Sequence, residues 1–197
     1  MASANTSDLK SALRSADIVH VAAHGSPTAI ALSDGDFTAD DVPRNKELKA
    51  RLVILRACET LFCGNEEQSI VWWLVRNGCS VIATQRAVDD QACRWFFEVL
   101  YADLLPGPKV GGRYLSTAIQ AASDTVLGRV ARLTDENARD RILRSLSASV
   151  LYGDPTMHLE LTFRRGANER QRGHERPASV LPPVMSSANG ASLKFAA

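Results

Sequence analysis

This sequence of 197 residues has almost no excess of positive over negative charge, no long apolar run and few cysteines. The 23 Lys and Arg residues balance 22 Asp and Glu residues, which leaves a formal net charge of +1 at pH 7. So even a balance provides no whole-molecule field, and we expect neither nucleic acid nor a membrane as a partner. The longest apolar runs, such as residues 71–75 and 79–84, are too short to cross a bilayer.

The cysteines do not form a disulfide framework or a metal-binding motif. The chain has Cys58, Cys63, Cys79 and Cys93, and none of them lies in a Cys-x-x-Cys pair. The amino terminus is polar and mixed in charge, without the apolar core of a secretory signal. We therefore expect a cytoplasmic protein with reduced thiols. The serine-hydrolase motif Gly-x-Ser-x-Gly is missing too, and no motif indicates a cofactor.

Apolar strands and amphipathic helices alternate along the chain. Buried parallel strands are predicted at residues 17–23, 51–56 and 79–84. Helices are predicted at residues 7–15, 66–76, 89–105, 112–123 and 135–147, and an extended segment at 150–155. This order predicts an α/β fold with a mostly parallel sheet. We expect one domain over residues 1–163 and a disordered or weakly ordered tail over 164–197, where Arg, Gly, Asn, Ser and Pro dominate.

His24 and Cys58 each follow the end of a predicted strand. Since chemistry in open α/β sheets gathers beyond the carboxyl ends of the strands, these residues form a candidate pair. An imidazole can take the proton from a thiol and later give it to a leaving amine. The amides of Gly25 and Cys58 are candidate donors to the oxyanion that develops on the substrate. Taken singly, either side chain is more often structural than catalytic.

The joint pattern resembles the CHAT domain, a branch of the caspase-like cysteine peptidases that also includes separases and gingipains. The resemblance rests on five segments in order: DIVHVAAHG, LSDGDFTADDV, RLVILRACET, VRNGCSVIATQRAVDDQACRWFFEVLYADLLPG and VLYGDPTMHL. It implies a caspase-like three-layer α/β/α sandwich, with His24 as base and Cys58 as nucleophile. It also implies a protein or peptide substrate and control by a regulatory protein partner.

The sequence departs from the family pattern in two places. Only about sixteen residues precede the histidine strand, where the family has a further strand and helix, so the sheet is apparently short at its amino-terminal side. This is compatible with a fragment, with a partner that covers the strand edge, or with a degenerate domain. In addition, Gln85 and Arg86 stand where the family often has Leu-Trp. Arg86 either alters substrate preference or reflects a site that is no longer catalytic.

His20, Asp90 and the remaining cysteines are further candidates for the site. His20 and His24 lie on the same face of a strand, but with Cys58 or Cys63 they match no strong zinc signature, and His20 is predicted to be a core residue. Asp90 is our candidate for an acidic side chain in the substrate cleft, which in caspase-like peptidases selects a basic residue. The other cysteines are predicted to be core or loop residues.

These observations favour a cysteine endopeptidase that works through a Cys58–His24 dyad. The alternative is a catalytically inactive CHAT-like scaffold that acts through protein contacts.

Overall fold

A computed structural model of the chain describes residues 4–44, 47–57, 59–60, 66–105, 114–157 and 193–196. The helices are α1 (Thr6–Ser15), α2 (Ile70–Arg76), α3 (Asp90–Leu104), α4 (Leu115–Val130) and α5 (Glu136–Ala148), with short 3-10 turns η1 (Ala39–Asp41) and η3 (Glu66–Gln68). The strands are β1 (Ile18–Ala22), β2 (Ala29–Leu32), β3 (Gly35–Thr38), β4 (Leu52–Arg56), β5 (Ser80–Thr84), β6 (Ser149–Tyr152) and β7 (Leu193–Ala196).

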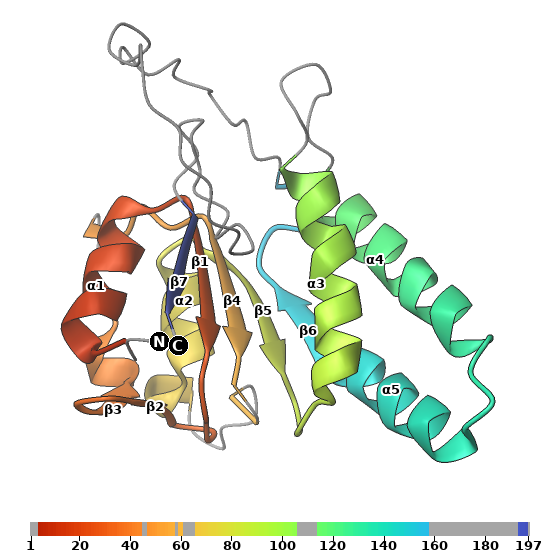
Figure 1. The fold of residues 1–197 in the computed structure, drawn as a ribbon. Helices are drawn as coiled ribbons and strands as arrows, with labels where there is room; N and C mark the ends of the chain where they lie inside the picture. Colours follow the sequence, from red (N-terminus) through yellow and green to blue (C-terminus); the bar gives the residue numbers. More distant parts are fainter. Residues whose placement is uncertain are drawn as a thin grey trace, which may run out of the picture.

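Five of the strands form one sheet in the order β6-β5-β4-β1-β7, and β2 and β3 form a separate hairpin (Figure 1). In the sheet β5, β4, β1 and β7 run parallel, while β6 is antiparallel to β5. The mostly parallel sheet predicted from the sequence is therefore confirmed.

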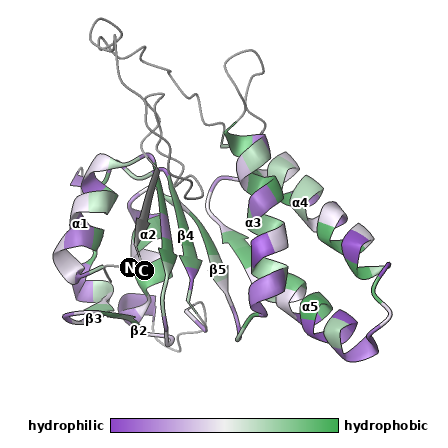
Figure 2. Ribbon diagram, in the orientation of Figure 1, coloured by the Kyte–Doolittle hydropathy of each residue, from purple (hydrophilic) through white to green (hydrophobic). Residues whose placement is uncertain are grey.

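Helices cover both faces of this sheet. Val19 and Val53 point from the strands to the side of α1 and α2, and Ile18 and Ile54 point to the side of α3, α4 and α5. Side chains alternate between the faces because successive residues of a strand point in opposite directions. Buried apolar residues of α1 and α2 cluster with one face of the central strands, and those of α3, α4 and α5 cluster with the other. The central strands β4 and β5 are largely hydrophobic (Figure 2). The result is the predicted three-layer α/β/α sandwich.

The three predicted parallel strands agree with β1, β4 and β5 to within a residue at each end, whereas the extended segment predicted at 150–155 corresponds to the shorter β6. Three helix ends differ as well, since the helix predicted from residue 112 begins at Leu115. The helix predicted from residue 66 begins at Ile70, because the Ser69 side chain accepts a hydrogen bond from the amide of Trp72 (3.2 Å) and caps it there. Residues 66–68 form η3 instead. Helix α4 continues to Val130, seven residues beyond the predicted end at residue 123.

Strand β7 lies along the outer edge of β1, with Ile18 opposite Leu193. The sequence predicts no strand at an edge of the sheet, because only a short region precedes β1, and β7 pairs along this side of β1. β7 falls within the segment predicted to be a tail, most of which lies outside the described residues. The predicted domain boundary near residue 163 lies there as well and stays a prediction.

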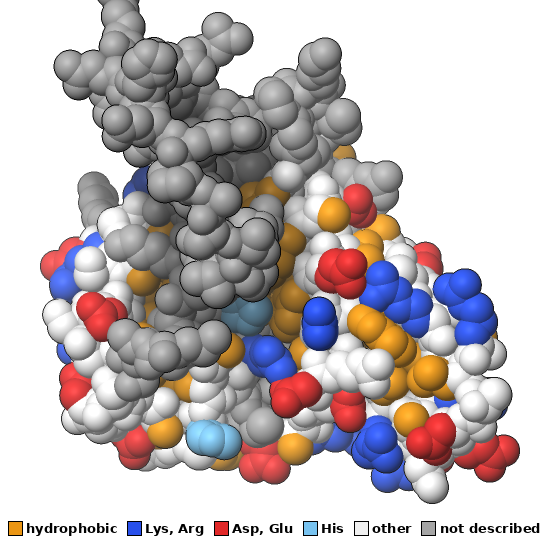
Figure 3. Space-filling view, viewed as in Figure 1, with side chains coloured by type: hydrophobic (Ala, Val, Ile, Leu, Met, Phe, Trp, Pro, Cys, Tyr) orange, Lys and Arg blue, Asp and Glu red, His pale blue; other side chains and the backbone are white. Residues whose placement is uncertain are grey.

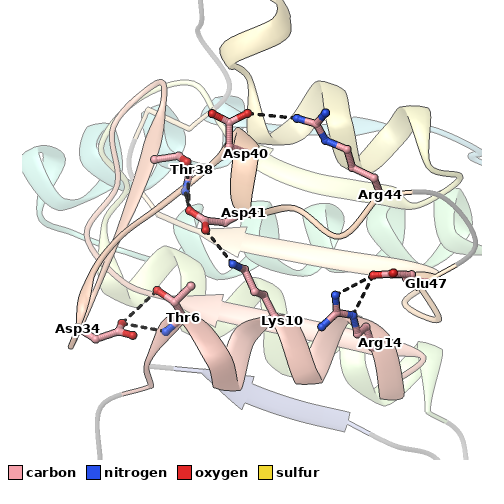
Figure 4. Close-up of polar contacts among 9 residues, drawn as sticks. All are labelled: Thr6, Lys10, Arg14, Asp34, Thr38, Asp40, Asp41, Arg44 and Glu47. Carbon is pink, nitrogen blue, oxygen red and sulfur yellow. Dashed lines mark hydrogen bonds and ion pairs between the residues drawn. The ribbon is translucent and has the colours of Figure 1, made fainter.

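Polar contacts fasten α1 to the β2–β3 hairpin and the segment after it (Figure 4). Asp34, in the hairpin turn, accepts hydrogen bonds from the amide (2.8 Å) and hydroxyl (3.1 Å) of Thr6. Lys10 pairs with Asp41 at 2.8 Å. The hairpin that follows His24 is thus anchored to the helix layer. Among the described helices, none has both the length and the apolar character needed to cross a membrane.

Candidate active site

The carboxyl ends of β1 and β4 form the frame of the site. The two strands are parallel neighbours with Ala22 opposite Arg56, and the amide of Ala23 donates a hydrogen bond to the carbonyl of Arg56 (3.3 Å). In Figure 1 their arrowheads lie side by side at the same end of the sheet. His24 is the second residue after Ala22, and Cys58 is the second residue after Arg56 in the sequence.

The structure places His24 at this edge with an exposed side chain. Its backbone is held, because the carbonyl of His24 accepts a hydrogen bond from the amide of Ala31 (2.9 Å). Gly25 is half-buried and pairs antiparallel with Ile30. The β2–β3 hairpin therefore fixes the backbone on which the imidazole is mounted, while the ring stays open to solvent.

Cys58, the predicted nucleophile, and its amide lie outside the described residues, but both neighbours are described. Ala57 is buried, and its carbonyl accepts hydrogen bonds from the hydroxyls of Thr60 (3.1 Å) and Thr84 (2.9 Å). Glu59 has a φ of 60°, a left-handed conformation that non-glycine residues seldom adopt. Ala57, Glu59 and Thr60 are thus described residues with a constrained geometry just beyond the end of a buried strand.

Asp90 and Arg56 form an ion pair beside this turn. Asp90 is the first residue of α3 and its side chain is 94% exposed, whereas that of Arg56 is 29% exposed. Asp90 therefore lies next to Arg56 just beyond β4, with its charge offset by the guanidinium, and its place in a substrate cleft stays a prediction. Arg86, in the connection between β5 and α3, is exposed.

Charges elsewhere on this side of the molecule are mixed in sign (Figure 3). Arg141 lies 3.6 Å from Asp89, the residue that caps α3, and Arg129 lies 3.1 Å from Glu98. No broad field of one sign is seen on the described part of this face. At the end of β4 the charges are paired as well, Arg56 with Asp90.

His20 is a core residue, as the sequence predicted. It is 7% exposed and packs on the ring of Phe97, with centroids 4.8 Å apart, and its Nδ1 lies 2.5 Å from the hydroxyl of Tyr101. Burial, with a smaller contribution from the nearby charge of Arg56, lowers the pKa of His20 to about 4. A ring so enclosed by α3 belongs to the core rather than to the edge where His24 stands.

Cys79 and Cys93 are buried, as predicted. Burial raises the pKa of the Cys79 thiol to about 11, and its Sγ donates a hydrogen bond to the carbonyl of Ala50 (3.0 Å). Burial also raises the pKa of Cys93. Neither thiol is suited to nucleophilic attack, since the thiolate is the reactive form. Cys63 lies outside the described residues, and the described part of the chain has no group of three or more His, Cys, Asp or Glu side chains arranged for a metal ion.

The sequence analysis missed the roles of Arg56, Thr60 and Thr84 at this edge. Arg56 and Thr84 could have been found, because each is a charged or hydroxyl residue at the end of an otherwise apolar strand, RLVILR and CSVIAT. Thr60 stands in the Ala-Cys-x-Thr segment, but its hydrogen bond to Ala57 depends on the turn.

Comparison with known proteins places this geometry in context. The structure is similar to the crystal structure of the Arg-specific cysteine proteinase gingipain R, with a TM-score of 0.55 and 13% sequence identity. The match covers 81% of this chain and 37% of that one, so the chain spans little more than a third of the gingipain R chain. At this identity the likeness establishes the caspase-like fold.

A search of curated protein sequences found no match. A comparison with protein-family models, by contrast, matches the CHAT domain over residues 1–147. That match covers β1 and β4, the hairpin after β1 and helix α3, and its residues include His24 and Cys58. The chain therefore belongs to the CHAT domain family, whose fold is caspase-like.

Proposed function

We propose that this chain is a cysteine endopeptidase in which Cys58 is the nucleophile and His24 the general base. The observation that carries the proposal is the parallel pairing of β1 with β4, in which Ala22 stands opposite Arg56. Two residues beyond this pair, the sequence has a histidine after the first strand and a cysteine after the second. Neighbouring carboxyl ends of parallel strands are where an α/β sheet assembles its chemistry.

The residues at this edge suit the steps of peptide hydrolysis. His24 takes the thiol proton of Cys58, the thiolate adds to the scissile carbonyl carbon, and the oxyanion forms between the amides of Gly25 and Cys58. The imidazolium then protonates the departing amine, which leaves a thioester on Cys58. Water, deprotonated by His24, hydrolyses the thioester and restores the thiol. Each well-aimed oxyanion donor contributes roughly 3–4 kcal/mol.

Asp90 is the residue we assign to substrate recognition, with Arg86 as a second group at the same rim. The carboxylate of Asp90 is almost fully exposed although it contacts Arg56. Such an oxygen can accept a second cation, so a basic substrate side chain can share it. Gingipain R, which has the same fold, is described as Arg-specific. We therefore expect cleavage after basic residues, and we expect Asp90→Asn to reduce the preference for arginyl over neutral peptides.

Control by a regulatory protein partner belongs to this proposal, because the chain matches the CHAT domain over residues 1–147 and the resemblance to caspase-like peptidases implies such control. Addition of the partner protein is expected to raise the rate of peptide hydrolysis by the isolated chain, while Cys58 remains the nucleophile.

Labelling with a fluorescent arginyl acyloxymethyl ketone tests the dyad. The wild-type chain is expected to be labelled at Cys58, as located by peptide mass spectrometry, and Cys58→Ala is expected to lose the label. Cys63→Ala is the matched control, because it removes a neighbouring thiol that the mechanism does not use. His24→Ala should slow labelling strongly without lowering the melting temperature, since the side chain is exposed.

The inactive scaffold is the competing outcome of this experiment. If the wild-type chain reacts no faster than Cys58→Ala while both are folded by circular dichroism, the peptidase proposal is wrong and the binding function is favoured.

A further inference from the structure

The carbonyl of Ala57 is held by two buried hydroxyls that come from different parts of the fold. Thr60 follows in the turn after β4, and Thr84 is the last residue of β5. Their Oγ1 atoms donate to the Ala57 oxygen at 3.1 Å and 2.9 Å. All three residues are nearly inaccessible, with exposures of 1% for Ala57, 1% for Thr60 and 4% for Thr84.

This arrangement replaces sheet pairing at the point where the sheet ends. The pairing of β4 with β5 runs from Leu52 opposite Ser80 to Ile54 opposite Ile82. Ala57 lies beyond β4, and side-chain hydroxyls there take the place of the backbone donors found further back. A carbonyl oxygen has two lone pairs, so two donors saturate it and fix its direction. Buried hydrogen bonds of this kind are costly to break.

Fixing this carbonyl also fixes the amide that follows it. A peptide unit is planar and trans, so the direction of a C=O determines the direction of the next N–H. The next N–H in the sequence belongs to Cys58. We propose that Thr60 and Thr84 are positioning residues that, through the carbonyl of Ala57, aim the Cys58 amide at the oxyanion of the substrate. The inference rests on the proposed function and assigns a role to two residues outside the dyad.

The effect of losing the hydroxyls follows from what an oxyanion donor contributes. Complete removal of one donor costs about 10²–10³ in rate. A donor that is present but misaligned loses part of this, and we expect a decrease of roughly 10- to 100-fold for the loss of both hydroxyls. Reactions of the thiol that form no oxyanion should not change.

Two probes separate positioning from a merely structural role. The thiolate adds to the carbonyl of the arginyl acyloxymethyl ketone, which forms an oxyanion, and the sulfur then moves to the methylene carbon as the carboxylate leaves and the ketone is restored. Iodoacetamide is attacked at a saturated carbon and releases iodide, so no oxyanion develops. The ratio of the two labelling rates at Cys58 therefore reports the aim of the amide, whereas changes in thiol access or thiol pKa affect both rates.

The variants are Thr60→Val and Thr84→Val, which keep the shape of the side chain and remove the donor, and Thr60→Ser and Thr84→Ser, which keep the donor. We expect each valine variant to lower the ratio of ketone to iodoacetamide labelling several-fold, and the double variant 10- to 100-fold. The serine variants should retain most of the wild-type ratio, because they keep the hydroxyl donor. Thermal unfolding of every variant identifies any that does not fold, and the other position then serves as the test.

Three outcomes would overturn the inference. Equal losses of both labels show that the hydroxyls act only on the fold or on the thiol, while the dyad itself stands. An unchanged ratio in folded valine variants shows that the amide is aimed without them. A wild-type chain whose Cys58 does not react with the ketone shows that the proposed function has failed, and the positioning role fails with it.

Discussion

Gly153 turns the chain after β6, directly against the start of β5. Its φ is +105°, and a Cβ atom at this position would lie 2.9 Å from the Cα of Ser80 and 3.0 Å from the carbonyl oxygen of Cys79. Both neighbours are backbone atoms at the start of β5, which lies between β4 and β6. A methyl group there can be accommodated only if the turn or the strand moves.

The cost of Gly153→Ala follows from these two effects. A non-glycine residue in a sparsely populated conformation costs about 1–3 kcal/mol, and the contact with the β5 backbone adds to it. The smaller entropy of the unfolded alanine chain returns about 0.4–1 kcal/mol. We expect a net destabilisation of about 3 kcal/mol, which corresponds to a melting temperature lower by about 6–12 °C for a domain of this size.

Two other glycines provide matched controls in the same thermal and urea unfolding assays. Gly78 has a φ of +90° with nothing within 4 Å of its Cβ position, so Gly78→Ala should cost only the conformational strain, about 1 kcal/mol. Gly128 lies in α4 with open space around it, and Gly128→Ala should stabilise by up to about 1 kcal/mol. If Gly153→Ala unfolds no more easily than Gly78→Ala, the steric reasoning is refuted.

Three further predictions concern titration and charge. Because the pKa of His20 in the fold is about 4, below its ordinary 6.5, the unfolded chain binds the proton more readily. His20 should therefore make stability fall as the pH drops from about 6.5 towards 4, by about 3 kcal/mol in full, and urea unfolding of His20→Gln should lack this contribution; an identical pH slope would contradict it. Asp90→Asn should change the free energy of unfolding by less than about 1 kcal/mol, because the ion pair with Arg56 is largely exposed on one side; a larger loss in urea unfolding would show that it holds the fold together. Cys79 and Cys93 should resist iodoacetamide at pH 7.5 in the folded chain and react in 8 M urea, as measured by mass spectrometry; rapid labelling without urea would contradict their raised pKa values.

The central strands and the order of the elements were predictable from local patterns. Runs such as LVILR are apolar and rich in branched side chains because β4 is buried on both faces, and such a run identifies its strand without any neighbour. His24 and Gly25 could be placed just beyond β1 for the same reason. The start of α2 was wrong by four residues, because the cap at Ser69 competes with an equally helical stretch before it.

Only the tertiary structure decided which distant residues meet at the edge of the sheet. Asp90 meets Arg56, which is 34 positions earlier, and Thr84 meets Ala57, which is 27 positions earlier. These contacts depend on the register of β5 beside β4 and on the entry angle of α3, and neither leaves a periodic trace in the sequence. The pairing of β7 with β1 is a further case, because a strand of four residues is too short to be predicted from its own sequence and is identified by its hydrogen bonds to β1. The sequence by itself determined the fold class and the two candidate residues of the dyad, since runs of apolar side chains identify the buried strands and where they end. The surroundings of that dyad were decided by backbone geometry, because hydrogen bonds and ion pairs between distant segments form only once the layers have packed.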